Sequence, residues 1–281
     1  MKGLGWLLLL SLGLAACAAP KNDTVKPTPF NITTKSGAWE LVWADEFDYT
    51  GLPNPAKWGY EVGYVRNNEA QYYTEKRSEN ARVENGLLII EARKDGDAVP
   101  EATTDYTSAS LHTHDTATWT YGRIEVRAKL PQGVGTWPAI WMLGTNIGDV
   151  GWPTCGEIDI MEHVGFEAGK IYGTVHTQAY NHVKGTSKGS SISIPKPHED
   201  FHVYAVEWFE DHMDFFVDDQ LYFTFKNEGT GNAAWPFDKP HYLILNLAIG
   251  GAWGGQYGID DKIFPQSYYV DYVRVFKASE E

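Results

Sequence analysis

Three acidic residues stand close together in the sequence G-E-I-D-I-M-E that begins at Gly156. On an α-helix, at ~100° per residue, Glu157 and Glu162 would point ~140° apart and could not act together. On a β-strand, Glu157 and Asp159 share one face, and a β-bulge near Ile160–Met161 would return Glu162 to that face. Three carboxyl groups on one face raise the pKa of at least one of them. One ionised carboxylate beside one protonated carboxylic acid is the pair that glycosidic bond hydrolysis requires.

Other readings of these residues stay open. The carboxylates could form a solvated face, or they could hold a calcium ion through their oxygens. Ile158 and Ile160 point away from the acidic face and would anchor the strand in a core, which favours a fixed arrangement. A zinc site would have to use His112, His114 and His198, and their spacing resembles no zinc motif.

The sequence predicts β-strands as the elements that position these residues. Short runs rich in Val, Ile, Tyr, Phe and Trp are separated by Gly, Pro, Asn and Asp, and no segment of ten or more residues has a convincing helical period. The predicted strands include Leu87–Ala92, Gly122–Leu130, Phe201–Trp208, Met213–Val217, Leu221–Phe225, Tyr242–Ala248 and Tyr268–Phe276. Many short strands without a second domain boundary predict an all-β fold, a β-sandwich or jelly roll.

Composition narrows the possible functions. The 281 residues carry 23 Lys and Arg against 37 Asp and Glu, a formal net charge of −14. We expect no nucleic-acid partner, because no basic stripe is available to neutralise phosphates. The 11 Trp, 16 Tyr and 12 Phe offer flat faces of the kind that line sugar-binding clefts. Two cysteines cannot form a disulfide scaffold.

The N-terminal sequence predicts an export signal. The apolar run over residues 4–14 is too short for a permanent membrane-spanning helix. The sequence L-A-A-C, which ends at Cys17, resembles a bacterial lipoprotein signal, so we predict a signal peptide over residues 1–16 and a lipid on Cys17. An ordinary secretory signal cut near Ala16 or Ala19 is the alternative.

Residues 17–36 are rich in Pro, Lys, Asn and Thr, and we predict that they form a flexible tether to a domain over residues 37–281. Ala18 follows the cysteine, in place of the acidic residue that would suggest inner-membrane retention. We therefore expect an exported, lipid-anchored protein of the outer membrane or cell surface.

The string E-I-D-I-M-E resembles the active-site signature of glycoside hydrolase family 16, in the longer E-x-D-x-x-E form typical of its laminarinase-like branch and of agarases and carrageenases. Further matching strings run along nearly the whole domain. They are L-V-W-A-D-E-F from Leu41, N-N-E from Asn67, Y-Y-T from Tyr72, E-N-A-R-V from Glu79, N-G-L-L-I-I-E-A-R from Asn85, W-P-A-I-W-M-L from Trp137, Y-G-T-V-H from Tyr172, V-E-W from Val206 and D-Y-V-R-V from Asp271. Together they resemble bacterial endo-β-1,3-glucanases, which implies a concanavalin A-like jelly roll with a concave substrate cleft.

The resemblance implies a role for each matching residue. Glu157 would be the nucleophile that forms a glycosyl-enzyme intermediate. Glu162 would be the general acid that protonates the leaving oxygen and then the base that activates water. Asp159 would hydrogen-bond the nucleophile and help to separate the two pKa values. Trp137 and Trp141 would line sugar subsites before the scissile bond, although Trp141 could instead pack in the core.

Other positions would contact the substrate. Asn68 and Arg93 resemble polar contacts to non-reducing-side glucosyl units, and His176 would lie on a neighbouring strand near the acid/base. Trp253 would stack on a sugar, within G-G-A-W-G-G, where the laminarinase branch often has Asn in place of Ala252. Arg93 could instead be a solvated strand residue, and His176 a hydrogen-bonded structural histidine.

The resemblance also implies one structural calcium ion, held by Glu46, the Gly86 carbonyl and Asp271. The alternative is that both carboxylates pair with basic neighbours such as Arg274. We expect no cofactor for catalysis.

The function expected from these patterns is retaining endo-hydrolysis of β-1,3-glucosidic bonds in a β-glucan such as laminarin, by a monomer. One alternative is a hydrolase of the same family that cleaves mixed-linkage β-glucan or a marine galactan. The other is a non-catalytic surface lipoprotein that binds polysaccharide. A pure binder has no need to keep Glu157 and Glu162 together, which favours an enzyme.

Overall fold

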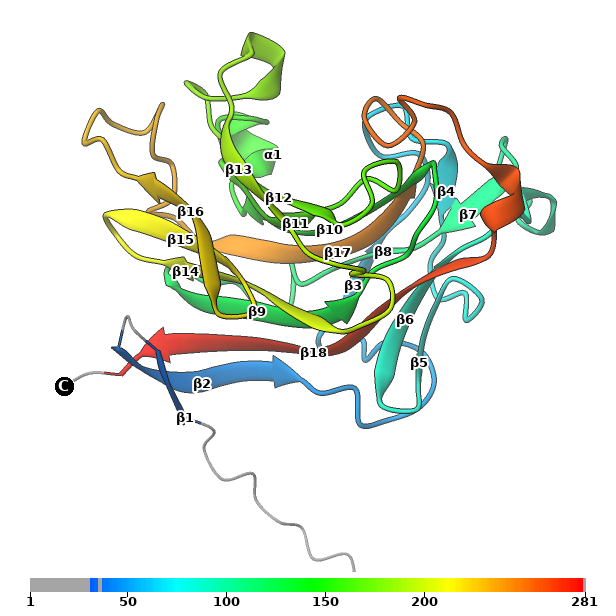
Figure 1. The fold of residues 1–281 in the computed structure, drawn as a ribbon, viewed down its shortest axis with the longest axis horizontal. Helices are drawn as coiled ribbons and strands as arrows, with labels where there is room; N and C mark the ends of the chain where they lie inside the picture. The colour runs from blue at the N-terminus through cyan, green and yellow to red at the C-terminus, as the bar shows by residue number, and fades with distance from the viewer. Residues whose placement is uncertain (1–30, 35–36, 280–281) are drawn as a thin grey trace, which may run out of the picture.

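The computed structural model describes residues 31–34 and 37–279. Over these residues the chain forms two large antiparallel sheets that pack against each other around one apolar core (Figure 1). The predicted all-β jelly-roll sandwich is confirmed. Helices in the described part are single turns: α1 (Ile147–Val150), η1 (Gly96–Ala98), η2 (His182–Lys184) and η3 (Asp261–Ile263).

The larger sheet has nine strands, with β1-β2-β18-β9-β14-β15-β16 in order and β5 and β6 attached through the first half of β18. Their bounds are β1 (Asn31–Thr34), β2 (Gly37–Asp45), β5 (Ala81–Glu84), β6 (Leu87–Ala92), β9 (Gly122–Lys129), β14 (His202–Trp208), β15 (His212–Val217), β16 (Gln220–Lys226) and β18 (Gln266–Ala278). All seven strands predicted from the sequence are present, with their ends shifted by up to two residues.

The smaller sheet carries the acidic segment and has the order β13-β12-β11-β10-β17-β8-β3. Its strands are β3 (Gly59–Glu61), β8 (Ser110–His112), β10 (Thr136–Gly144), β11 (Glu157–Glu162), β12 (Lys170–His176), β13 (Lys188–Ser193) and β17 (His241–Ile249). The short strands β4 (Gln71–Tyr73) and β7 (Tyr106–Ser108) pair separately. Loops rise above the outer face of this sheet on both sides of β10 and β11 (Figure 1).

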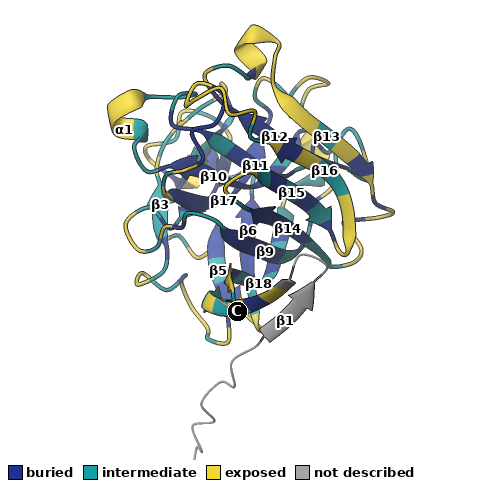
Figure 2. Ribbon diagram, turned by 90° about the vertical axis from the view of Figure 1, so that its left-hand side faces the viewer, coloured by how far each residue is buried: buried dark blue, intermediate teal, exposed yellow. Residues whose placement is uncertain are grey.

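Side-chain alternation explains how the two layers hold together. On β9, the alternate residues Ile124, Val126 and Ala128 are fully buried in the core. Each large apolar side chain removed from water in this way stabilises the fold by about 1.5–3 kcal/mol. Figure 2 shows the buried strands at the centre and the more exposed edge strands β13 and β16. The acidic strand β11 is therefore fixed on a rigid support.

The predicted flexible tether is wrong at its C-terminal end. Residues 31–34 form β1, which pairs antiparallel with β2 across a register from Asn31–Glu40 to Thr34–Gly37. A polar run can join a sheet in this way because main-chain hydrogen bonds, rather than apolar side chains, define the pairing. The signal peptide, Cys17 and the rest of the tether lie outside the described residues. No helix in the described part of the chain is long and apolar enough to cross a membrane.

Candidate active site

A β-bulge in β11 brings the three acidic residues to one face, as the sequence predicted. Trp141 of β10 pairs with Asp159, but the preceding Ile140 pairs with Met161, so Ile160 is the extra residue. Ile160 and Met161 are both fully buried in the core. Because the bulge resets the alternation, Glu162 returns to the outer face with the other two acids.

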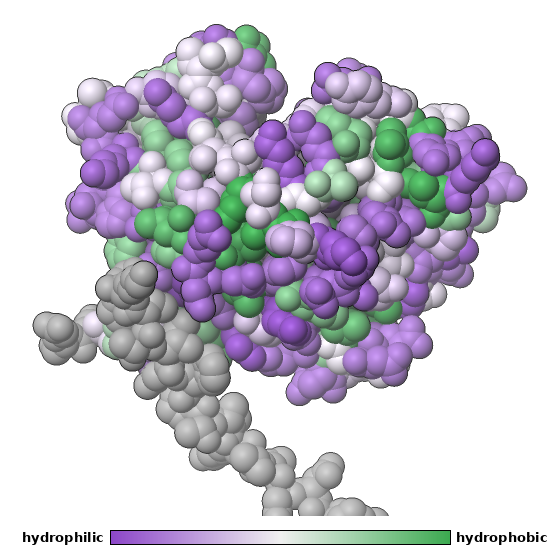
Figure 3. Space-filling view, viewed as in Figure 1, coloured by the Kyte–Doolittle hydropathy of each residue, from purple (hydrophilic) through white to green (hydrophobic). Residues whose placement is uncertain are grey.

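An open cleft of about 830 Å³ lies over this face of the smaller sheet. Figure 3 shows the surface hollowed between the raised loops. Glu157, Asp159 and Glu162 line the cleft together with aromatic and polar side chains from seven separate segments. These include Glu61, Arg66, Asn67, Glu69, Trp137, Trp141, Trp152, Thr174, His176, His182, Ser187, Tyr242, Asn246, Ala252 and Trp253.

Glu157 is held by a tryptophan. The Trp152 indole Nε1 donates a hydrogen bond of 2.8 Å to Glu157 Oε2. Burial raises the pKa of Glu157 to about 7, while the Trp152 hydrogen bond and the positive charge of Arg66 oppose that rise. These two contacts favour the ionised carboxylate, which is the form a nucleophile needs.

Glu162 has a similar contact but a different charge environment. The Trp137 indole Nε1 donates a hydrogen bond of 3.1 Å to Glu162 Oε1. Burial and the negative charge of Glu157 raise the pKa of Glu162 to about 8. Burial and both glutamates also hold the pKa of Asp159 well above its usual range. The negative charge of Glu157 therefore favours the protonated form of Glu162, whereas the Arg66 charge favours the ionised form of Glu157.

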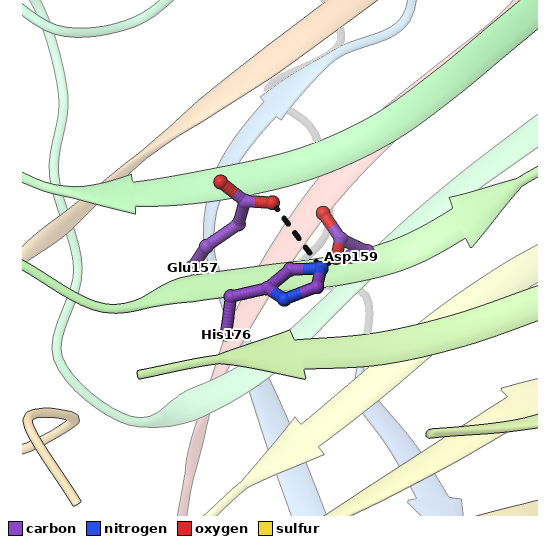
Figure 4. A group of neighbouring side chains, drawn as sticks. All are labelled: Glu157, Asp159 and His176. Atoms are coloured by element: carbon purple, nitrogen blue, oxygen red, sulfur yellow. Dashed lines mark ion pairs between the residues drawn. The ribbon is translucent and has the colours of Figure 1, made fainter. Parts of the chain in front are cut away.

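His176 lies beside Glu157, not beside Glu162 as we had predicted (Figure 4). Its Nε2 is 3.4 Å from Asp159 Oδ2 and 3.7 Å from Glu157 Oε1. The reason is the register of β12, in which His176 pairs with Glu157 whereas Tyr172 pairs with Glu162. Burial lowers the pKa of His176 to about 4, so the imidazole is neutral near pH 7.

A polar network fixes one wall of the cleft. The Trp141 indole donates to Asn246 Oδ1 at 2.8 Å, and Asn246 donates in turn to the Tyr73 hydroxyl at 2.9 Å. The Arg66 guanidinium lies 4.8 Å from the Trp141 ring centroid and forms an ion pair with Glu61. Trp141 is thus 93% buried and also lines the cleft. The two alternatives considered for this residue, packing and cleft lining, both apply.

Trp253 also lies in the cleft, on the side of Glu162. Its ring meets Trp137 edge-on at 5.6 Å and Tyr172 at 4.9 Å between centroids. Ala252 lines the cleft beside it. The aromatic surface is preserved here, whereas the side chain of Ala252 offers no polar contact.

Two predicted contacts lie elsewhere. Arg93 follows β6 in the larger sheet, where its guanidinium pairs with Glu91 and with Asp95 at 2.9 Å. Asn68 is exposed and does not line the cleft; its neighbour Asn67 does. Both asparagines have left-handed backbones, with φ of 55° and 52°, and this tight turn carries Asn68 away from the cleft.

Sequence analysis missed Arg66, Asn67 and Trp152. Asn67 is the first residue of the matching string N-N-E and Arg66 directly precedes it, so the correct segment was recognised but the wrong residue was chosen. Trp152 lies in the G-W-P segment before β11, outside any predicted strand. A large aromatic residue in a Gly-Pro loop close to three acids was the available signal.

Metal-binding geometry among the described residues is limited. Glu157, Asp159 and His176 place three potential ligand atoms within 4.8 Å of one another. Glu157 and Asp159 also belong to the acidic face of β11. The predicted zinc alternative receives no such support: His112 and His114 have ring centroids 6.3 Å apart, and His198 lies near Glu199.

The predicted calcium positions converge on one seam of the larger sheet. Strand β18 pairs with β6 up to Val270 and with β2 from Val273 onward, so Asp271 lies at the change of partner. Gly86 precedes β6 and Glu46 follows β2. Two carboxylates and a carbonyl suit calcium. Both carboxylates are also engaged by arginines: Arg274 donates to Glu46 at 2.7 and 2.9 Å, and Arg127 to Asp271 at 2.5 Å.

Comparison with known proteins identifies the family. Residues 68–274 match the model of glycosyl hydrolases family 16. The chain belongs to glycoside hydrolase family 16. It is 50% identical over 286 aligned residues to a β-glucanase of Rhodothermus marinus, covering 99% of this chain and 95% of that protein.

Solved structures of family 16 relatives have the same fold. The X-ray structure of the laminarinase from Rhodothermus marinus is 55% identical, with a TM-score of 0.82 over 86% of this chain and 98% of that chain. A mutant of SCLam, a non-specific endo-β-1,3(4)-glucanase of family 16, is 46% identical, with a TM-score of 0.82 over 89% and 99% of the two chains. That crystal presents a 1,3-β-D-cellobiosyl-glucose at its active site. The chain is accordingly a glycoside hydrolase with the laminarinase fold.

Proposed function

We propose that this family 16 enzyme is a retaining endo-β-1,3-glucanase that acts on laminarin-like β-glucan. The observation that carries the proposal is the placement of Glu157, Asp159 and Glu162 on one face of the bulged strand β11, at the base of an open cleft. An open cleft accepts the interior of a polymer. The names of two similar proteins, a β-glucanase and a laminarinase, support the same substrate class.

The reaction proceeds in two displacements. Glu157, ionised and hydrogen-bonded by Trp152, attacks the anomeric carbon, while the proton of Glu162 passes to the leaving glycosidic oxygen. The new ester links the sugar to Glu157. Glu162, now ionised, takes a proton from water as the water oxygen attacks the same carbon and Glu157 leaves. Asp159 lies between the two glutamates, and its carboxyl group interacts with Glu157 throughout.

A second candidate is broader activity on mixed-linkage β-glucan. The support is the SCLam relative, whose name describes a non-specific endo-β-1,3(4)-glucanase. Ala252 points the same way, because a cleft wall without a polar side chain discriminates less between linkages. Comparable kcat/KM values on laminarin and on mixed-linkage glucan would favour this candidate.

The test is reducing-end release from laminarin by the full chain, with proton NMR to follow the anomer formed first. We expect short oligosaccharides of β configuration, together with loss of hydrolysis in Glu157→Gln while laminarin binding is retained. Initial release of the α anomer would contradict the retaining mechanism. Unchanged turnover in Glu157→Gln would contradict the assignment of the nucleophile.

We also propose, from the sequence alone, that the enzyme is exported and anchored through a lipid on Cys17. Labelling of the chain with a radioactive fatty acid in a bacterial host, and loss of that label in Cys17→Ser, would test the anchor. We further propose that calcium binds at the seam between Glu46, Gly86 and Asp271.

A further inference from the structure

A second groove opens beside the cleft, at the edge of the molecule where β13 and β16 lie side by side (Figures 1 and 2). It has a volume of about 360 Å³. Ser187 belongs to the lining of both the cleft and the groove. The groove therefore adjoins the cleft at Ser187.

The strand register aligns the acidic residues of β11 with residues of β13 that line this groove. Glu157 of β11 pairs with His176 of β12, and the next residue pair, Val175 with Lys188, places Ser187 opposite His176. In the adjacent row, Asp159 pairs with Thr174, and Thr174 pairs with Gly189 of β13. Thr174, His176 and Ser187 line the cleft together with the two acids, so both rows face it and cross the sheet at right angles to the strands. Neighbouring strands are about 4.8 Å apart, which puts β13 about 10 Å from β11.

Gly189 has no side chain to block the surface between the cleft and the groove. A Cβ at this position would lie 2.6 Å from the Gly173 carbonyl oxygen and 3.0 Å from Thr174 Oγ1. Any side chain here would collide with β12, the strand through which both rows pass. The bare backbone leaves the floor continuous from Thr174 outward.

The groove has the chemistry of a sugar site. Phe223 offers a partly buried ring, which is held by packing on Phe215 at 5.0 Å between centroids. Lys188 lies over the Tyr180 ring at 4.7 Å, and the Tyr180 hydroxyl donates to Glu228 at 2.6 Å, so the polar wall is fixed. An aromatic face beside hydrogen-bonding side chains is the combination that carbohydrate rings require.

We propose that this groove, formed by Ser187, Lys188, Gly189, Phe223, Thr224 and Lys226, is a distal subsite for the same β-glucan chain, beyond the sugar units next to the broken bond. This inference deepens the proposed function and rests on it. Short oligosaccharides end before the groove, whereas long glucans reach it. The groove thus favours polymeric over short substrates.

The experiment compares kcat/KM on laminarin and on a short β-1,3-oligosaccharide for Phe223→Ala and Lys188→Ala. We expect KM for laminarin to rise about three- to tenfold in Phe223→Ala, with kcat and short-substrate turnover unchanged. Leu221→Ala is the matched control for Phe223→Ala, because Leu221 lies on the same strand, is 49% exposed and does not line the groove. Lys196→Ala is the matched control for Lys188→Ala, because Lys196 is also an exposed lysine and does not line the groove.

The outcomes separate the two proposals. An unchanged ratio of laminarin to short-substrate kcat/KM in both groove variants, or an equal loss on both substrates, would overturn the distal subsite alone. If wild type cleaves neither substrate, the proposed activity fails. Migration in a native gel that contains laminarin then tests glucan binding in the groove without any cleavage. Weaker retardation of Lys188→Ala than of wild type supports the distal subsite, and equal retardation of the two proteins rejects it.

Discussion

At the scale of single residues, each glutamate of the candidate active site has its own tryptophan. Trp152 hydrogen-bonds Glu157 and Trp137 hydrogen-bonds Glu162, each through the indole N–H. Donors of this kind favour the ionised carboxylate, so both indoles oppose the effect of burial. The difference between the two glutamates comes from the other charges: Arg66 favours ionisation of Glu157, whereas Glu157 itself disfavours ionisation of Glu162.

We predict that removal of each indole N–H moves a different limb of the pH profile. Loss of a hydrogen bond to a carboxylate raises its pKa by about one unit. In Trp152→Phe the pKa of Glu157 rises, and since Glu157 must be ionised, the acidic limb of kcat/KM moves to higher pH. In Trp137→Phe the pKa of Glu162 rises, and since Glu162 must be protonated, the basic limb moves to higher pH.

The measurement is kcat/KM on laminarin between pH 4 and pH 10 for both variants and wild type, because the limbs belong to the coupled pair and only differences between variants assign them. The two variants are controls for each other. The same limb moving in both variants would contradict the separate roles of Trp152 and Trp137.

At the scale of elements, the strands were predictable because burial on one face imposes a period of two, as on β9 and β18. The bulge was predictable because only an extra residue lets Glu157 and Glu162 share a face of β11. Asn68 was misplaced because two successive left-handed residues reverse side-chain direction, and no simple alternation reports this. Strand β1 was missed because its pairing uses the backbone, which its sequence does not reveal.

Strand β12, which supports β11, allows a prediction about packing. Gly173 lies against the core, where an added Cβ would meet the Tyr222 hydroxyl oxygen at 2.3 Å. Gly173→Ala should lower the free energy of unfolding by about 1–3 kcal/mol through overpacking. The Tyr222 hydroxyl is buried and has no hydrogen-bond partner among the described residues, so Tyr222→Phe alone should cost little.

The double variant Gly173→Ala with Tyr222→Phe should recover part of the stability lost in Gly173→Ala, because the closest atom is removed. Urea denaturation of the four proteins gives the coupling free energy. Additive effects would show that the strain arises elsewhere, for example against the Phe215 ring, whose nearest atom is 3.1 Å from the added Cβ.

At the scale of the whole molecule, the cleft combines segments that lie far apart in the sequence. Glu61 and Arg66 come from the beginning of the domain, Trp152 from the loop before β11, and Trp253 from the loop after β17. Family motifs placed Trp253 in advance, but the contacts of Arg66 and Trp152 depend on the arrangement of loops in three dimensions. The sequence pattern therefore predicted the acidic residues of the site more completely than the residues that shift their pKa values.

At the seam, β2 and β6 both pair with β18 of the larger sheet, so calcium bound there should stabilise the fold. A ligand that binds only the folded state at 100 times its Kd adds about 2.7 kcal/mol, or several degrees in Tm. We expect Tm to rise when calcium replaces EDTA, and the rise to disappear in Asp271→Asn. Asp115→Asn is the control, since Asp115 is exposed and interacts with His114 away from the seam. Equal Tm values in calcium and EDTA would mean that Arg274 and Arg127 keep Glu46 and Asp271, and that ion pairs alone hold the seam.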